Sequence, residues 1–154
     1  HYEPMSGMFR WKVSGGKRSF GKTAGTKRPR GHIRIVIEGK GYYAHRLAWL
    51  YMMGEWPEIG IDHANGDSGD NRFCNLRVST QSQNQANSKR YSNNLSGYKG
   101  VTFDKCRNKW VSQIFVNGRN NHIGRFNNPI DAAVARDIKA KELFGAFARL
   151  NFCP

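Results

Sequence analysis

The sequence has little of three features that each mark a class of protein. Its three cysteines, Cys74, Cys106 and Cys153, lie 32 and 47 residues apart. Such a scattered, odd set forms neither a disulfide framework nor a paired-cysteine zinc site, so we expect a reduced setting and no structural zinc. No apolar run approaches the ~20 residues of a membrane helix, so we expect no membrane partner. Acidic residues number 11 against 25 lysines and arginines, which leaves a net charge of +14.

The positive charge is concentrated in two parts of the chain. Residues 1–53 carry a net charge of +9, residues 54–96 carry −1, and residues 97–154 carry +6. Basic flanks suit the phosphates of a polyanion, and a centre rich in Asp and Asn suits a hard divalent cation. Hydrophobic residues make up 38% of the chain, enough to build a core. We therefore expect a nucleic acid as partner, with a merely solvated basic surface as the alternative.

Hydrophobic periodicity and turn residues predict an α+β fold. We expect helices over 45–53, 81–88 and 130–144, and strands over 8–13, 32–37, 59–64, 76–79, 98–103, 110–116 and 121–126. Residues 14–31 hold six basic residues and five glycines, a composition typical of a flexible basic arm. The last three strands and the last helix read as one small antiparallel sheet covered by a helix.

Polar residues with metal-binding chemistry gather in the near-neutral centre. Asp62-His63 ends a predicted strand, and Asn75 and Asn84 follow His63 by 12 and 21 residues. If the two strands pair and the next helix packs over them, Asp62, His63 and Asn84 can converge. Carboxylate and amide oxygens are hard ligands for Mg²⁺ or Mn²⁺, and a neutral histidine can accept a proton from an attacking water. Taken alone, an Asp-His pair is more often a helix cap or a hydrogen-bonded core histidine.

The surrounding residues change that balance, because eight short pieces occur in order at compatible spacing within residues 42–88. The pieces are His45-Arg46-Leu47-Ala48, Gly54-Glu55-Trp56-Pro57, Asp62-His63, Asn65-Gly66-Asp67, Asp70-Asn71-Arg72, Asn75-Leu76-Arg77, Thr80 and Asn84. This segment resembles the HNH endonucleases of the ββα-metal (His-Me finger) type found in phage-borne and homing enzymes. The resemblance implies that Asp62 and Asn84 bind Mg²⁺ or Mn²⁺, that His63 is the general base, and that Asn75 stabilises the catalytic loop.

Other residues of the segment have weaker assignments. Three arginines are candidates for DNA contact: Arg46, Arg72 and Arg77. Pairing with nearby acids is the alternative for the last two. For His45 we weigh phosphate contact against a place in the core and favour the core. His32 and His122 are expected to lie away from the site and not to be ligands.

The C-terminal part resembles a second family over about residues 97–152. The matching residues are Tyr98, Gly100-Val101, Lys109-Trp110, Ile114, Gly124, Phe126, Ala132-Ala133, Ala135, Asp137, Gly145 and Asn151-Phe152. They resemble the ethylene-response-factor (APETALA-type) DNA-binding domain, in which a sheet enters the major groove. The plant domains have three arginines where this chain has Lys99, Thr102 and Asp104, so the plant target sequence does not carry over.

Polar and basic side chains of this part are candidates for DNA contact. They are Lys99, Thr102, Lys105, Arg107, Lys109, Gln113, Arg119 and Arg125. For any one of them a solvated charge is the alternative. As a set on one sheet face, they indicate a surface that binds DNA.

The sequence thus predicts a two-part, metal-dependent endonuclease acting on double-stranded DNA, more often as a monomer than as an obligate oligomer. Residues 1–53 would form a supporting sheet, arm and helix, residues 54–88 the nuclease core, residues 89–96 a linker, and residues 97–154 the DNA-reading domain. Two alternatives stay open: a DNA-binding regulator with a decayed nuclease unit, and a structural RNA-binding protein.

Overall fold

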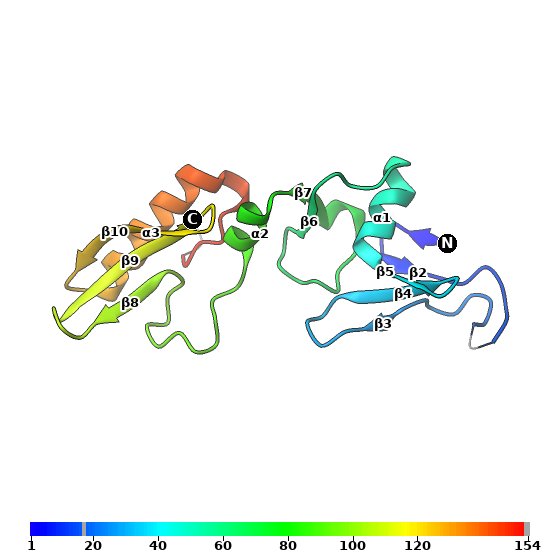
Figure 1. Ribbon diagram of the computed structural model, residues 1–154, viewed down its shortest axis with the longest axis horizontal. Helices are drawn as coiled ribbons and strands as arrows, with labels where there is room; N and C mark the ends of the chain where they lie inside the picture. The colour runs from blue at the N-terminus through cyan, green and yellow to red at the C-terminus, as the bar shows by residue number, and fades with distance from the viewer. Residues whose placement is uncertain (17, 153–154) are drawn as a thin grey trace. The chain divides into compact units, whose positions relative to one another are not determined.

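The computed structural model describes residues 1–16 and 18–152, which form two compact units, His1–Ser79 and Thr80–Pro154. Each unit has its own strands and helices (Figure 1), and each has its own buried apolar residues. The division precedes the linker expected over 89–96, because the helix after residue 80 makes its contacts with the C-terminal sheet. Within the described residues, no helix is long and apolar enough to span a bilayer.

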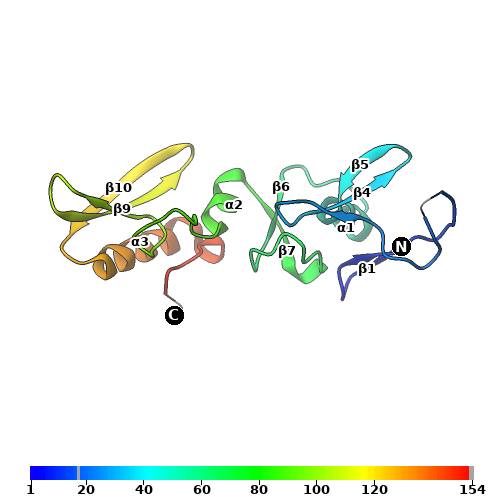
Figure 2. The ribbon, with the colours of Figure 1, turned by 90° about the horizontal axis from the view of Figure 1, so that it is seen from below.

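The first unit consists of short strands around one helix. In chain order it comprises β1 (Tyr2–Glu3), β2 (Met8–Phe9), β3 (Thr26–Lys27), β4 (Ile33–Ile37), β5 (Lys40–Tyr43), α1 (Ala44–Met53), β6 (Gly60–His63), the 3-10 turn η1 (Phe73–Asn75) and β7 (Leu76–Ser79). β1 pairs with β2, β3 to β5 form an antiparallel sheet, and β6 pairs with β7. Figure 2 shows α1 beside the β4–β5 hairpin, and residues of α1 contact both strands of the hairpin.

Two small apolar clusters hold this unit together, and α1 belongs to both. One cluster joins Ala44 of α1 to Ala24 and Ile35, and the other joins Ala48 of α1 to the buried residues Tyr2, Ile61 and Leu76. Helix α1 ends at Gly54, whose φ of 81° suits glycine. Packing on both sides fixes the first turn of α1 against the end of β6, where the predicted catalytic residues lie.

The N-terminal region differs from the sequence expectation. The strand expected over 8–13 is limited to Met8–Phe9, which pairs with β1, a strand that the pattern did not predict. Part of the arm expected over 14–31 is β3, which pairs with β4, while Thr23 bridges to Arg10. Lys17 of this arm lies outside the described residues. Long-range pairing therefore orders a segment whose composition alone indicated an open loop.

The second unit is the predicted three-stranded sheet with a helix. It comprises α2 (Gln81–Asn87), β8 (Val101–Asp104), β9 (Lys109–Val116), β10 (Arg119–Phe126), α3 (Pro129–Phe144) and the 3-10 turn η2 (Gly145–Phe147). The strands are antiparallel in the order β10–β9–β8. Helix α3 covers one face, where Val101, Ala132 and Ala133 are fully buried. Helix α2 begins with a capping box between Thr80 and Gln83.

A buried acidic residue ties the C-terminal turn to α3. Asp137 accepts hydrogen bonds from the backbone N–H groups of Asn151 and Phe152 at 2.6 and 3.0 Å and from the Arg136 guanidinium at 3.0 Å. The Asn151 amide oxygen in turn accepts from the backbone N–H of Lys99 at 2.6 Å. The matching residues Asp137 and Asn151-Phe152 are thus explained by a structural role.

Candidate active site and DNA-contact surface

The β6–β7 hairpin carries the predicted catalytic pair. Asp62 and His63 are both buried at the end of β6, and Asp62 lies opposite Arg77 on β7. The Arg77 guanidinium donates to Oδ2 of Asp62 from Nε at 2.9 Å and from its terminal nitrogen at 2.8 Å. This ion pair holds the Asp62 carboxylate in one orientation beside His63.

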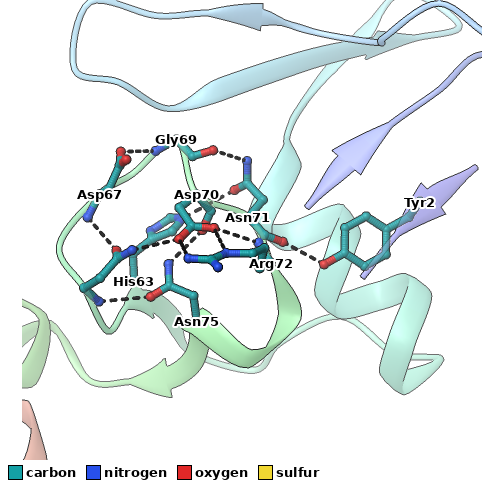
Figure 3. A network of polar contacts seen from close by, with 9 residues as sticks. Tyr2, His63, Asp67, Gly69, Asp70, Asn71, Arg72 and Asn75 are labelled. Atoms are coloured by element: carbon teal, nitrogen blue, oxygen red, sulfur yellow. Dashed lines mark hydrogen bonds and ion pairs between the residues drawn. The ribbon is translucent and has the colours of Figure 1, made fainter. Parts of the chain in front are cut away.

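The loop between β6 and β7 is closed by Asn75, as the resemblance implies. Its amide oxygen accepts from the backbone N–H of Asn65 at 3.0 Å, and its amide nitrogen donates to the carbonyl of Asp70 at 2.8 Å (Figure 3). Its own carbonyl accepts from Ala64 at 2.9 Å. One buried side chain thus joins the two ends of the loop that follows His63.

Asn71 is a site residue that the sequence reasoning did not single out. It is 2% exposed, and its Oδ1 lies 3.3 Å from Nε2 of His63. Its amide nitrogen donates to the Gly69 carbonyl at 3.2 Å, which orients the amide so that the oxygen faces the imidazole (Figure 3). In the sequence Asn71 sits among turn-forming residues, so no local signal marked its contact with His63.

The N-terminal segment supports this loop from behind. The Tyr2 hydroxyl donates to the Asn71 carbonyl at 2.7 Å, and the Pro4 carbonyl accepts from Phe73 at 3.2 Å. Gly7 has a φ of 72°, and a Cβ there would lie 2.4 Å from the backbone nitrogen of Arg72. Only glycine permits this approach, so the first residues form part of the support of the site. Burial raises the pKa of Tyr2 to about 12, which keeps the donating hydroxyl protonated.

Three histidines from distant parts of the first unit come together. His32 precedes β4, His45 lies in the first turn of α1, and His63 ends β6. One ring nitrogen of each lies within 4.8 Å of those of the other two, a set that could hold a metal ion. The expectation that His45 belongs to the core is confirmed, since it is 8% exposed. The expectation that His32 lies away from the site is wrong, because the β3–β4 sheet folds back toward α1.

Burial sets the protonation of this cluster. Burial lowers the pKa of His45 to about 3, with further lowering by the nearby His63, His32 and Arg46. Burial also lowers the pKa of His63 and His32, although the hydrogen bond that His63 donates to Asn71 and the charge of Asp62 oppose the shift at His63. All three rings are therefore neutral at pH 7, the form that a general base or a metal ligand requires.

The other predicted residues of the segment 42–88 lie on different elements. The Arg46 guanidinium lies 5.8 Å from the Trp56 ring and donates to the Pro57 carbonyl at 3.4 Å. Arg72 pairs with Asp70 at 2.6 Å, and its hydrogen bonds hold the pKa of that carboxyl at about 2. Asn84 lies on the exposed side of α2 in the second unit. Arg72 and Arg77 thus both pair with acidic residues, Asp70 and Asp62, which is the alternative to DNA contact considered from the sequence.

The sheet of the second unit has one face away from α3. Val101, Trp110 and Phe126 pack with the helix, so alternation along the strands directs their neighbours to the other face. Four of the predicted DNA-contact residues share that face by register: Thr102, Lys109, Gln113 and Arg125. Arg119 stands opposite Val116 at the hairpin end, in the register of the helix-facing residues.

Ion pairs and hydrogen bonds engage several of these candidates. Arg107 and Arg125 approach Asp104 at 3.2 and 3.8 Å, and the ammonium of Lys109 donates to Asn127. Lys105 is exposed in the turn before β9. Such exposed ion pairs contribute little to the stability of the fold.

Lys99 is placed differently from the other candidates. Its ammonium donates to the carbonyls of Gln85, Ala86 and Ser88 at 3.2, 2.6 and 2.6 Å, so it caps the end of α2. Burial lowers its pKa to about 7, and the charges of Arg136 and Arg149 add to this lowering. Contact between Lys99 and DNA would require these three hydrogen bonds to break.

With the fold and the site described, the chain can be compared with known families. Residues 42–86 match the HNH endonuclease family. The C-terminal region carries a partial similarity to ethylene-response-factor domains. The chain is 28% identical over 130 residues to protein 3.8 of Escherichia phage T7, covering 81% of this chain and 93% of that protein.

Two further relatives match a larger and a smaller share of the chain. An uncharacterized HNH endonuclease of Acanthamoeba polyphaga mimivirus is 31% identical over 109 residues, which cover 70% of this chain and 56% of the relative. An ethylene-responsive transcription factor of Arabidopsis thaliana is 46% identical over 57 residues, which cover 36% of this chain and 31% of the factor. The second match, to about a third of each chain, supports the partial similarity of the C-terminal region to ethylene-response-factor domains.

Proposed function

We propose that the protein is a divalent-metal-dependent endonuclease that hydrolyses double-stranded DNA. The observation that carries the proposal is His63, buried at the end of β6 beside Asp62 and held by Asn71 inside the HNH segment. Each chain has one such base and so cuts one strand at a time, which makes a monomer a nicking enzyme. Residues 54–88 act as the nuclease core, supported by 1–53, and residues 97–154 bind the target after the linker 89–96.

The contacts of Asn71 assign the nitrogen that accepts the proton. Because the Asn71 amide nitrogen donates to Gly69, its oxygen accepts from Nε2 of His63. A neutral imidazole has one N–H, so the lone pair then lies on Nδ1. In the reaction, Nδ1 of His63 accepts a proton from a water molecule while the oxygen of that water bonds to phosphorus. The bond from phosphorus to the leaving oxygen breaks, and that oxygen gains a proton from solvent.

The donor chemistry of the predicted ligands fits a hard divalent cation. Asp62 offers a carboxylate oriented by Arg77, and Asn84 offers an amide oxygen, a set that suits Mg²⁺ or Mn²⁺. The assignment of Asn84 to the same ion rests on the family resemblance. A bound ion would stabilise the negative charge that develops on the phosphate and on the leaving oxygen.

The exposed sheet face of the second unit is the proposed DNA-binding surface. Thr102, Lys109, Gln113 and Arg125 share this face, with Lys105 and Arg107 in the adjoining turn and Arg119 at the hairpin end. The +6 charge of residues 97–154 supports binding to phosphates. Arg46, Arg72 and Arg77 are proposed to contact the DNA backbone near the scissile bond.

Nicking of supercoiled plasmid tests the catalytic proposal. With Mg²⁺ the protein should convert supercoiled DNA to the open circle, and His63→Ala should lose at least ~100-fold in rate while it still binds DNA, the scale of a lost general base. His1→Ala, an exposed histidine of the same unit, is the matched control. Full activity of His63→Ala, or of the unchanged protein in excess EDTA, would contradict the mechanism.

A second pair of variants tests the metal assignment. Asn84→Ala should lose most activity at low Mg²⁺ and regain part of it at high Mg²⁺, because a ligand has been removed. Gln85→Ala, the exposed neighbour on α2, should match the unchanged protein. Equal behaviour of the two variants across a Mg²⁺ titration would remove Asn84 from the metal site.

A further inference from the structure

We propose that His32, His45 and His63 form a second kind of metal site, which binds a borderline transition metal ion such as Zn²⁺ and switches off the reaction that depends on His63. The binding half of this inference stands on the geometry of the three rings alone. The inhibitory half rests on the role proposed above for His63.

The geometry of the cluster is close to that of a three-imidazole site. The ring centroids lie 5.3 Å apart for His32 and His45, 5.1 Å for His45 and His63, and 5.9 Å for His32 and His63. Ligand nitrogens around a tetrahedral zinc ion lie ~3.4 Å apart, since each Zn–N bond is about 2.1 Å. The observed nitrogens are within 4.8 Å of one another, so modest side-chain rotations close the site.

Two buried nitrogens in this cluster lack partners. Among the described residues, neither Nδ1 of His32 nor Nδ1 of His45 makes a hydrogen bond, although both atoms are buried. Burying a polar atom without a partner costs stability unless another group satisfies it. A metal ion is a ligand that satisfies buried imidazole lone pairs without a proton donor, and these two rings face the third member of the set.

The ligand type selects the metal. Imidazole nitrogens suit Zn²⁺, Cu²⁺, Ni²⁺ and Co²⁺, whereas carboxylate and amide oxygens suit Mg²⁺ and Mn²⁺. The three rings therefore favour a different ion from the one proposed for Asp62 and Asn84. Three protein ligands leave a fourth position for water. The negative charges of Asp62, Asp67 and Asp70 act on His63, and they favour a bound cation there.

The inhibitory effect follows from the single lone pair of a neutral imidazole. When His63 donates that pair to a metal ion, it cannot accept a proton from water. The two uses of His63 exclude each other, so Zn²⁺ should lower the cleavage rate even at saturating Mg²⁺. The cleavage rate would then depend on the relative concentrations of the two kinds of metal ion.

Metal binding is tested directly, without DNA. Protein lacking any affinity tag is titrated with Zn²⁺ by calorimetry, and with Co²⁺ by visible absorption, which reports nitrogen ligation. We expect one site per chain, weakened at least ~100-fold by His32→Gln, because one of three ligands is lost. His122→Gln, an exposed histidine outside the cluster, should bind as the unchanged protein does. Unchanged binding by His32→Gln, or the absence of a site, would overturn the proposal.

The inhibitory half is tested by the ratio of nicking rates with and without Zn²⁺, at fixed saturating Mg²⁺, for each protein. The rate with Zn²⁺ divided by the rate without it should be about 0.1 or lower for the unchanged protein and for His122→Gln. For His32→Gln this ratio should stay near one. Equal ratios for all three would overturn the inhibition. If no protein cuts DNA at all, the proposed function fails, whereas the calorimetric result still decides the metal site.

Discussion

The two units hold their functional residues by different means. In the first unit no described strand exceeds five residues, and the loop that carries Asn71 and Asn75 is held by side-chain amides bonded to backbone groups. In the second unit β9 and β10 have eight residues each and lie on a 16-residue helix. Polar contacts thus fix single atoms at the proposed catalytic site, whereas regular elements present a whole face for binding.

The largest expected effect tests the second unit. Asp137→Ala removes the acceptor of several hydrogen bonds and the partner of Arg136, which is 2% exposed. Leaving that charge buried should cost about 3–5 kcal/mol of unfolding free energy. Thermal unfolding followed by Trp110, the one tryptophan in the sequence of residues 80–154, measures the change.

The matched control for this variant is Asp131→Ala. Asp131 lies in the first turn of α3 and is exposed, so its loss removes only a favourable helix-end charge, worth at most about 1 kcal/mol. Signals from Trp49 in the first unit should stay unchanged in both variants. If Asp137→Ala shifts Trp49 and Trp110 together, the two units do not unfold independently.

Acid should weaken the first unit next. The folded pKa of His45 is about 3, below its ordinary value of 6.5, so between these values the unfolded chain binds the extra proton. The contribution of a neutral His45 is therefore complete above pH 6.5 and is lost as pH falls toward 3. The slope is about 1.4 kcal/mol per pH unit, or about 2 kcal/mol at pH 5.

Urea unfolding at pH 7.5 and pH 5, with EDTA present, measures this effect. The midpoint of the unfolding transition reported by Trp49 should move to a lower urea concentration at pH 5. The midpoint reported by Trp110 should move less, since the described histidine of the second unit, His122, is exposed. Equal shifts of both signals would show that the buried cluster is not the acid-sensitive part.

A smaller effect is expected when the positioning residue is changed. Asn71→Ala should slow nicking roughly tenfold, because one hydrogen bond to His63 is lost. That bond raises the pKa of His63 against the lowering by burial, so the acid limb of the rate profile should move to lower pH. Asn65→Ala, in the same loop but without a described bond to His63, should keep the limb in place. An unmoved limb in Asn71→Ala would reduce Asn71 to a packing role.

The smallest effect concerns the binding face. Arg125→Ala should reduce the slope of log affinity against log salt by about 0.9, the value of one phosphate contact. Lys141→Ala, an exposed cation on α3, should leave the slope unchanged. Binding to a duplex at four salt concentrations gives both slopes. A reversed order of the two variants would place DNA on the helix side of the unit.

The sequence predicted regular elements better than it predicted contacts. The helices at 45–53 and 130–144 and the strand 76–79 carry local periodicity, and the structure has them within a residue or two. The role expected for Asn75 rests on family spacing and stays a prediction; the structure gives the hydrogen bonds by which its side chain closes the loop. Local patterns cannot indicate that His32 reaches His63, or that Asn71 bonds it, because those contacts depend on how the β3–β4 sheet and the N-terminal strands fold back.

The basic composition did not indicate which single lysines and arginines are available to contact DNA. Lys99 has the same charge as its neighbours in the sequence, yet its ammonium ends a helix inside the unit. The distinction arises from the position of α2, which no spacing rule fixes. Arg125 and Lys109, by contrast, lie on β10 and β9, and the register of these strands places both on the face away from α3.

The bond from Tyr2 to Asn71 spans 69 residues of chain, and this sets an order of events during synthesis. At ~5–20 residues per second, a ribosome needs roughly 3 to 14 seconds to make the second partner after the first. Until then β1 and β2 have no loop to support. The loop around His63 therefore closes only after both partners are made, and a nascent chain released before residue 71 carries the histidines without the hydrogen bonds that orient them.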